Sequence, residues 1–248
     1  MAELRVLEDL DELARAAAEE ITRSAEEAVA ARGRFTIALS GGGTPKPVYH
    51  LLAEEPYRDR IDWSRMHVFW GDDRHVPPDH PESNFGMAHD ALLSKVPVPP
   101  DNIHRMRAEK PDAEKAAEEY AWTLRSAFNL EEGEWPRFDL VLMGIGEDAH
   151  TASFFPGSEA VRERSRLVIA PWVSSLGTFR ITLTAPVFNR AALALFLVSG
   201  EKKAEALRAV LEGDFQPDRF PAQVIRPEEG RLLWLVDRSA AGLLRSVG

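Results

Sequence analysis

Short apolar runs alternate along this chain with longer segments of helical periodicity, and this alternation limits the possible folds more than any other feature. The apolar runs, which have the length of buried strands, are residues 35–39, 66–70, 138–143, 179–184, 193–199 and 232–236. Helical periodicity marks residues 9–32, 44–55, 84–94, 112–129 and 201–212. Strands that alternate with helices are typical of an α/β fold, so we predict a largely parallel sheet flanked by helices.

Two of the predicted helices carry signals at their ends. Asp9 is a candidate N-cap with Glu12 three positions later, and Gly33 is suited to the left-handed turn that ends a helix. Thr44 followed by Pro45 predicts the start of the next helix, with Thr44 as its N-cap.

Length and composition narrow the class of protein. The 248 residues contain no linker-like stretch and no internal repeat, so we interpret residues 1–248 as one domain. Cysteine is absent, which excludes disulfide scaffolds, thiol catalysis and cysteine-based metal sites. The amino terminus lacks the features of a secretory signal, and no run approaches 18 consecutive apolar residues. We therefore expect a soluble, cytoplasmic protein without membrane contact.

Acidic residues outnumber basic ones by 40 to 30, so the formal net charge is −10. This balance argues against a nucleic-acid-binding protein, which normally carries a basic surface. It also disfavours an anionic substrate at first sight, although the net charge of a chain does not determine the charge of one site.

A glycine-rich turn follows the first apolar run. Ser40, Gly41, Gly42, Gly43 and Thr44 join this predicted strand to a helix. Glycines allow a ligand to approach the backbone, and the N–H groups at a helix start bind anions. We expect a phosphate here, although a strand-to-helix turn without a ligand has the same composition. The sequence matches neither the P-loop motif nor G-x-G-x-x-G.

Asp72, Asp73 and Arg74 follow the second apolar run. Arginine suits a phosphate or carboxylate, and the acids are candidates for binding hydroxyls or orienting the arginine. A solvated charged loop is the alternative. His75 and His80 lie nearby with Asp79 and Glu82, but nothing in their pattern enforces metal geometry, so we expect no metal.

The third polar cluster, residues 144–153, follows the apolar run 138–143. His150 is a candidate general base, because imidazole titrates near neutral pH, and Asp148 is positioned to orient it. The alternative is a histidine that only packs the loop. Ser153 lacks the G-x-S-x-G context of a nucleophilic serine.

Two further cations fall at unusual positions. Arg180 lies within an otherwise apolar strand, and Lys203 lies in the first turn of a predicted helix. Both positions are unfavourable for a cation unless an anion is close. An exposed side chain is the alternative for each.

Taken in order, these clusters resemble the family of 6-phosphogluconolactonases and glucosamine-6-phosphate isomerases. The matching segments are SGGGTP at 40–45, DDR at 72–74, GIGEDAHTASFFPG at 144–157, RITLT at 180–184 and GEKK at 200–203. The resemblance implies a Rossmann-like fold and hydrolysis of 6-phospho-D-glucono-1,5-lactone, with no cofactor. The expected partner is this small sugar-phosphate lactone, and the chain is expected to be a monomer or homodimer.

In this interpretation, His150 and Asp148 activate water, and backbone N–H groups or Arg74 stabilise the oxyanion. The implied site for the phosphate comprises the 40–44 turn, Arg180 and Lys203. Asp72 is the remaining residue expected to bind the substrate. The family usually has Glu at Asp73 and Gly at Ala149, so Ala149 would be strained if its φ angle is positive.

Two other functions remain possible from the sequence. Glucosamine-6-phosphate deaminases resemble this chain, but they carry a glutamate for ring opening at the position of Phe155. A non-catalytic sugar-phosphate sensor is the second alternative, although a pure binding protein does not need the Asp148–His150 pair.

Overall fold

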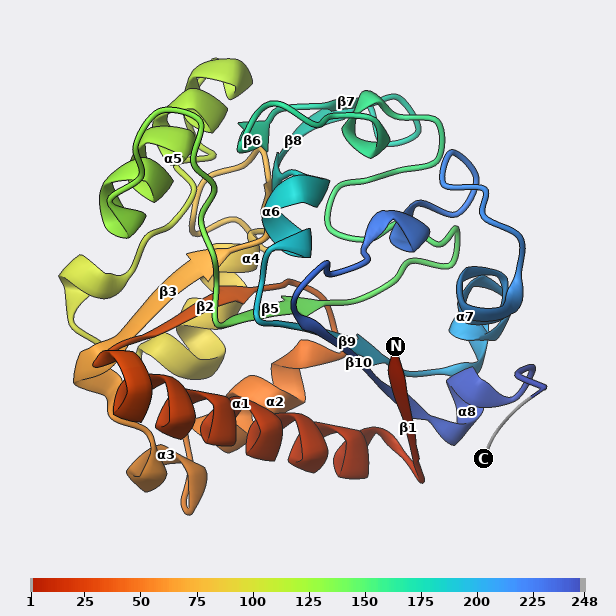
Figure 1. The fold of residues 1–248 in the computed structure, drawn as a ribbon, viewed down its shortest axis with the longest axis horizontal. Coiled ribbons are helices and arrows are strands. Elements are labelled where there is room, and N and C mark those ends of the chain that lie inside the picture. Colours follow the sequence, from red (N-terminus) through yellow and green to blue (C-terminus); the bar gives the residue numbers. More distant parts are fainter. Residues whose placement is uncertain (1, 246–248) are drawn as a thin grey trace.

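The structure, a computed structural model, describes residues 2–245 and is built around a six-stranded sheet (Figure 1). Its strands lie in the order β1-β10-β9-β5-β2-β3, and every neighbouring pair is parallel. They are β1 (Glu3–Leu7), β2 (Phe35–Leu39), β3 (Met66–Trp70), β5 (Leu140–Met143), β9 (Leu193–Val198) and β10 (Arg231–Asp237). The predicted α/β fold with a largely parallel sheet is confirmed. The edge strand β1 was not among the predicted strands.

The central strands are buried along their whole length. Every residue of β2, β5 and β9 is buried, which explains why these strands are uninterrupted apolar runs in the sequence. Such strands need helices on both faces of the sheet. In Figure 1, α1 lies along one side of the sheet, and α5 and α6 lie on the opposite side.

Five of the eight helices among residues 2–245 match predicted segments with small differences, and the three short helices α3, α6 and α8 were not predicted. The eight helices are α1 (Leu10–Arg32), α2 (Pro45–Leu52), α3 (Tyr57–Arg60), α4 (Asn84–Ala88), α5 (Ala113–Phe128), α6 (Ala185–Asn189), α7 (Ala204–Glu212) and α8 (Arg238–Ala241). The segment predicted as one helix over 84–94 continues from α4 as a π-helical turn, His89–Leu93. No helix among residues 2–245 is long and apolar enough to span a membrane.

The predicted signals at the helix ends have mixed outcomes. Asp9 caps α1 by accepting a 2.8 Å hydrogen bond from the Glu12 N–H, and Gly33 ends it with φ of 72°. The predicted start of the second helix is confirmed, because α2 begins at Pro45 directly after Thr44. The capping role predicted for Thr44 is wrong, because its backbone is already helical and its side chain makes no cap hydrogen bond. The helix α2 also ends at Leu52 instead of near residue 55.

A second, antiparallel sheet accompanies the main one. It contains β4 (Asp72–Arg74), β8 (Thr178–Leu183) and β6 (Val168–Ile169), and β7 (Trp172–Val173) also pairs with β8. The predicted strand 179–184 therefore exists as β8 but lies outside the parallel sheet. Its pairing with β4 places Arg180 directly opposite Arg74.

Candidate active site

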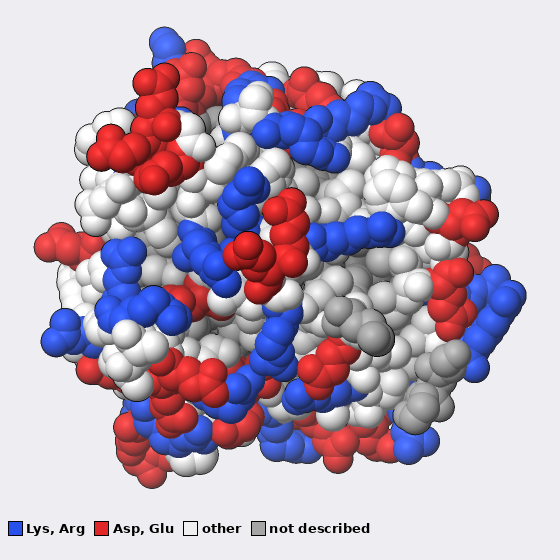
Figure 2. Space-filling model, in the orientation of Figure 1, with Lys and Arg blue, Asp and Glu red and all other residues white. Residues whose placement is uncertain are grey.

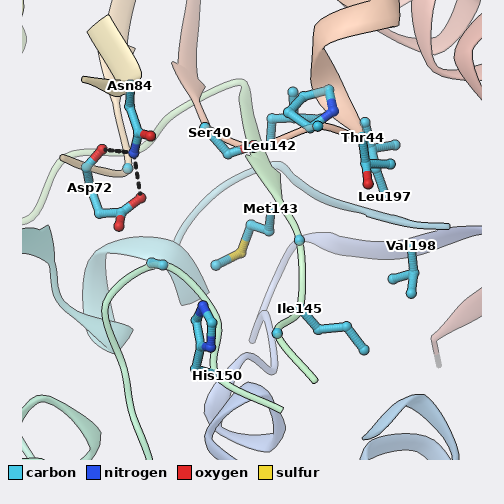
Figure 3. Close-up of a pocket in the computed structure, with 18 of the residues that line it drawn as sticks. Ser40, Thr44, Asp72, Asn84, Leu142, Met143, Ile145, His150, Leu197 and Val198 are labelled. Atoms are coloured by element: carbon cyan, nitrogen blue, oxygen red, sulfur yellow. Dashed lines mark hydrogen bonds between the residues drawn. The ribbon is translucent and has the colours of Figure 1, made fainter. Parts of the chain in front are cut away.

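A cavity of about 940 Å³ lies at the carboxyl ends of the parallel strands, where open α/β sheets bind their ligands. Every site residue predicted from the sequence lines this cavity: Ser40, Gly41, Gly42, Gly43, Thr44, Asp72, Arg74, Asp148, His150, Arg180 and Lys203. Figure 3 shows Ser40 and Thr44 on one side of it and His150 on the other, with Met143 of β5 between them. Segments far apart in the sequence therefore meet around one space.

The glycine turn is held in place by a buried tyrosine. The hydroxyl of Tyr49 accepts a 3.2 Å hydrogen bond from the Ser40 N–H and donates one of 2.7 Å to the Ser40 carbonyl. Burial raises the pKa of Tyr49, so it stays protonated. Gly42 has φ of 104°, which favours glycine, and a Cβ on Gly41 would lie 1.7 Å from the Asn84 side chain. The turn therefore needs both glycines in this conformation.

His150 and Asp148 form a close pair at the cavity wall. His150 Nδ1 lies 2.5 Å from Asp148 Oδ1, and the same oxygen accepts a 3.1 Å hydrogen bond from the His150 N–H. Burial raises the pKa of Asp148, but its hydrogen bond with His150 and the charge of that ring outweigh burial, so the pKa lies below its usual value. Because Nδ1 faces the carboxylate, Nε2 is the nitrogen left for other chemistry.

The surrounding loop fixes the imidazole ring. Phe155 stacks against it with ring centroids 4.4 Å apart, and the ring leaves no room for a side chain on Gly146. A Cβ on that residue would lie 2.0 Å from His150 Nδ1. Ala149 adopts φ of 63° and Ala152 φ of 46°, so two alanines occupy the left-handed region. Ala149 is thus strained, as the departure from the family pattern predicts.

Arg74 and Arg180 are opposite neighbours on β4 and β8. Within residues 2–245 neither has a carboxylate within 4 Å; Arg74 donates to the Glu82 carbonyl and Arg180 to the Phe179 carbonyl. Burial and then the charge of Arg74 lower the pKa of Arg180. Like charges directly across two strands repel each other, so this arrangement favours an anionic ligand.

Lys203 lies at the start of α7, next to a loop anchored by Asp237. That carboxylate accepts hydrogen bonds from Ser199 Oγ at 2.5 Å and from the Gly200 N–H at 3.1 Å. Lys203 has no ion-pair partner in the part of the chain that the structure describes. The face in Figure 2 has Lys and Arg interspersed with Asp and Glu, so this face of the molecule is not a basic surface.

The two acids of β4 have different surroundings. Asp73 is buried and accepts hydrogen bonds from the backbone N–H groups of Asn84 at 2.7 Å and Phe85 at 3.1 Å, at the start of α4. Burial raises its pKa to about 6. The two backbone hydrogen bonds, which act against this effect of burial, hold Asp73 at the start of α4. Asp72 lines the cavity and accepts a 2.7 Å hydrogen bond from Ser153 Oγ.

Sequence reasoning missed several residues of this wall. Asn84 lines the cavity, as do Ser175 and Leu176 from the loop between β7 and β8. Ser83 caps α4 and so marks the neighbourhood of Asn84, but nothing in the sequence brings that cap to the glycine turn. The pairing of β8 with β4 is equally non-local.

The histidines near β4 make other contacts. His75 Nε2 lies 2.6 Å from the Lys110 carbonyl oxygen, and His80 Nδ1 accepts a 3.1 Å hydrogen bond from the Glu82 N–H. Residues 2–245 hold no group of three or more His, Asp or Glu side chains arranged to bind a metal ion.

Comparison with known proteins gives two close curated relatives. The chain is 43% identical over 225 residues to a 6-phosphogluconolactonase of Synechocystis sp., covering 91% of both chains. It is 41% identical over 241 residues to a 6-phosphogluconolactonase of Nostoc sp., covering 97% of this chain and 98% of the relative.

Solved structures share the whole fold. The 6-phosphogluconolactonase from Trypanosoma cruzi superimposes with a TM-score of 0.88 at 30% identity, over 99% of this chain and 98% of that one. A monomeric glucosamine-6-phosphate deaminase shares the fold with a TM-score of 0.82 at 22% identity, over 97% of this chain and 99% of that one.

A family model described as glucosamine-6-phosphate isomerases/6-phosphogluconolactonase matches residues 8–234. This match confirms the resemblance predicted from the sequence motifs. The chain belongs to the glucosamine-6-phosphate isomerase/6-phosphogluconolactonase family.

Proposed function

We propose that the chain hydrolyses 6-phospho-D-glucono-1,5-lactone to 6-phospho-D-gluconate, the lactone-opening step of the oxidative pentose phosphate pathway. The observation that carries this proposal is the close pair of His150 and Asp148 in a cavity whose cationic side chains lack carboxylate partners among residues 2–245. Relatives at 41–43% identity bear the name of this activity. The substrate is an ester with a phosphate, and the cavity offers chemistry for both groups.

In the proposed reaction, His150 acts as the general base. Its Nε2 removes a proton from a water molecule as the water oxygen attacks the lactone carbonyl carbon. Asp148 is hydrogen-bonded to Nδ1, so Nε2 points away from the carboxylate and is the nitrogen that accepts the proton. Asp148 also stabilises the imidazolium that forms. The stack of Phe155 on the ring supports this orientation.

The resulting tetrahedral intermediate carries a negative charge on the former carbonyl oxygen. We assign its stabilisation to backbone N–H groups around the cavity. When the intermediate collapses, the bond between the carbonyl carbon and the ring oxygen breaks, and His150 returns its proton to that oxygen. The products are a carboxylic acid, which ionises, and a free hydroxyl. No metal or cofactor takes part in this scheme.

The phosphate of the substrate is assigned to the glycine turn, Arg180 and Lys203. The N–H groups of a helix start and two cations suit a dianion. The register of β4 and β8 supports adding Arg74 to this group, because its charge already acts on Arg180. Arg74 is thus proposed for two roles, binding of the phosphate and the oxyanion role considered for it from the sequence.

The deaminase alternative needs an additional acid or base for ring opening. The corresponding position is Phe155, whose ring is stacked on His150 and has no titratable group. A sensor would need the phosphate site but not the Asp148–His150 pair. Neither alternative is favoured by a feature of this cavity.

A pair of assays tests the proposed function. Acid release is measured from freshly generated 6-phosphogluconolactone, with spontaneous hydrolysis subtracted, and ammonia release is measured from glucosamine 6-phosphate. We expect strong acceleration of acid release and no ammonia. Ammonia production would favour the deaminase, and substrate binding without faster hydrolysis would favour the sensor.

A further inference from the structure

Asp72 is a buried carboxylate that faces the cavity but has no assigned partner in the proposed reaction. The residue is 8% exposed, and one oxygen, Oδ2, accepts the 2.7 Å hydrogen bond from Ser153 Oγ. The other oxygen, Oδ1, lies 3.4 Å from Asn84 Nδ2, which is a long hydrogen bond. No cation forms an ion pair with Asp72 among residues 2–245. Oδ1 therefore has lone pairs that a ligand hydroxyl could use.

Two neighbours fix the orientation of this carboxylate. Asn84 Nδ2 also donates a 2.9 Å hydrogen bond to the Asp72 backbone carbonyl. Because both Asp72 atoms facing Asn84 are acceptors, the amide nitrogen must point toward them. Ser153 is fully buried and has no other hydrogen bond from its hydroxyl in the described structure. Ser153 and Asn84 thus hold Asp72 from two sides.

The Ser153 contact also connects Asp72 to the loop that carries His150. Ser153 lies on the same tight loop as His150, since the Phe154 N–H donates a 2.9 Å hydrogen bond to the Thr151 carbonyl. Figure 3 shows the Asp72 carboxylate on the side of Asn84 that faces His150. Asp72 and His150 line the same cavity, so one bound lactone can contact both residues.

Only one of the atoms next to the lactone carbonyl carbon carries a donor. The carbonyl carbon is bonded to the ring oxygen, which has no hydrogen, and to C2, which bears a hydroxyl. We propose that Asp72 Oδ1 accepts a hydrogen bond from the C2 hydroxyl of the lactone and so selects 2-hydroxy lactones, with Ser153 and Asn84 as positioning residues. This inference rests on the proposed lactonase function and adds a determinant of its substrate.

The test compares 6-phosphogluconolactone with its 2-deoxy analogue. A hydrogen bond to a charged group should give the wild-type protein about 10- to 100-fold higher kcat/KM for the hydroxylated lactone. In Asp72→Asn this preference should fall to within a few-fold of unity. In Ser153→Ala it should fall several-fold, mainly through slower turnover of the hydroxylated lactone. A purely structural defect would slow both substrates equally.

Ser158→Ala is the matched control, because it removes a serine hydroxyl near the same loop outside the Asp72 contacts. We expect it to keep the wild-type preference. Equal wild-type kcat/KM for both lactones, or an unchanged preference in Asp72→Asn and Ser153→Ala, would overturn the inference and leave the lactonase proposal intact. Failure to accelerate hydrolysis of either lactone would overturn both. If Asp72→Asn does not fold, the wild-type and Ser153→Ala ratios still decide.

Discussion

Adding one methyl group at Gly146 should displace the candidate base, His150, without any substitution of His150 itself. In Gly146→Ala the new Cβ would lie 2.0 Å from His150 Nδ1, 2.2 Å from His150 Cε1 and 2.5 Å from Asp148 Oδ1. Ordinary van der Waals contact begins near 3.4 Å, so the ring and the methyl group must separate by about 1.4 Å. The carboxylate that orients the ring is displaced by the same methyl group.

A displacement of this size has a predictable kinetic cost. A 1 Å misplacement of a catalytic group can cost on the order of 10²-fold in rate. Complete loss of a general base costs about 10²–10⁴-fold. We therefore expect kcat of Gly146→Ala to fall by at least about 10²-fold. KM should change little, because the phosphate-binding residues lie on other elements. The assay is acid release from fresh lactone, corrected for spontaneous opening.

Gly144→Ala provides the matched control on the same loop. The nearest atom to its added Cβ would be the Leu197 carbonyl oxygen at 3.6 Å, which is an ordinary contact. We expect this variant to keep kcat within a few-fold of wild type. Both variants should show wild-type circular dichroism. A folded Gly146→Ala protein with the kcat of Gly144→Ala would refute the assigned geometry of the His150–Asp148 pair.

Other predictions concern the phosphate site, the loop strain and acid stability. Steady-state kinetics of Arg180→Met and Lys203→Met should each show a KM raised about 10- to 100-fold and a kcat within a few-fold of wild type. An unchanged KM in both variants would mean that the phosphate site is assigned to the wrong residues. Ala149→Gly should raise the free energy of unfolding by about 0.5–1 kcal/mol and Tm by about 1–4 °C, since φ is 63° there, whereas Ala17→Gly within α1 should lower both. Burial and the neighbouring His67 lower the pKa of His104 to about 4. As pH falls from 6.5 toward 4, this histidine is protonated in the unfolded chain before it is protonated in the folded protein, so the free energy of unfolding should fall by about 1–3 kcal/mol. In urea titrations, the free energy of unfolding of His104→Phe should fall less over this pH range than that of the wild-type protein. If the two free energies change with pH in parallel, the lowered pKa of His104 is not the cause.

The parallel sheet was predictable because its central strands are buried on both faces. Apolar runs such as 35–39 and 193–198 have few alternatives to a buried strand, and the longer helices between them have clear periodicity. The edge strand β1 was missed because its residues are mostly half-buried or exposed, so its pattern is weak. Thr44 shows that a favourable N-cap residue does not always cap, since the glycine turn extends the helical backbone through it.

The candidate site was predictable as a set of residues but not as a geometry. The rule that ligands bind at the carboxyl ends of parallel strands groups the 40–44 turn with His150. The opposition of Arg74 and Arg180 depends on pairing between segments more than 100 residues apart in the chain, which no local pattern contains. The contact of the Asn84 side chain with the glycine turn is also non-local. Non-local strand pairing and non-local side-chain contacts are therefore the information that the sequence pattern lacked.

The central claim is that His150 is the base that activates water for lactone opening. Its most direct test is kcat/KM of His150→Ala on freshly generated 6-phosphogluconolactone, beside the wild-type protein and with spontaneous hydrolysis subtracted. Because a general base contributes about 10²–10⁴-fold, the account predicts a fall of that size in a protein that keeps its fold by circular dichroism. A folded variant whose kcat/KM stays within a few-fold of wild type would contradict the account.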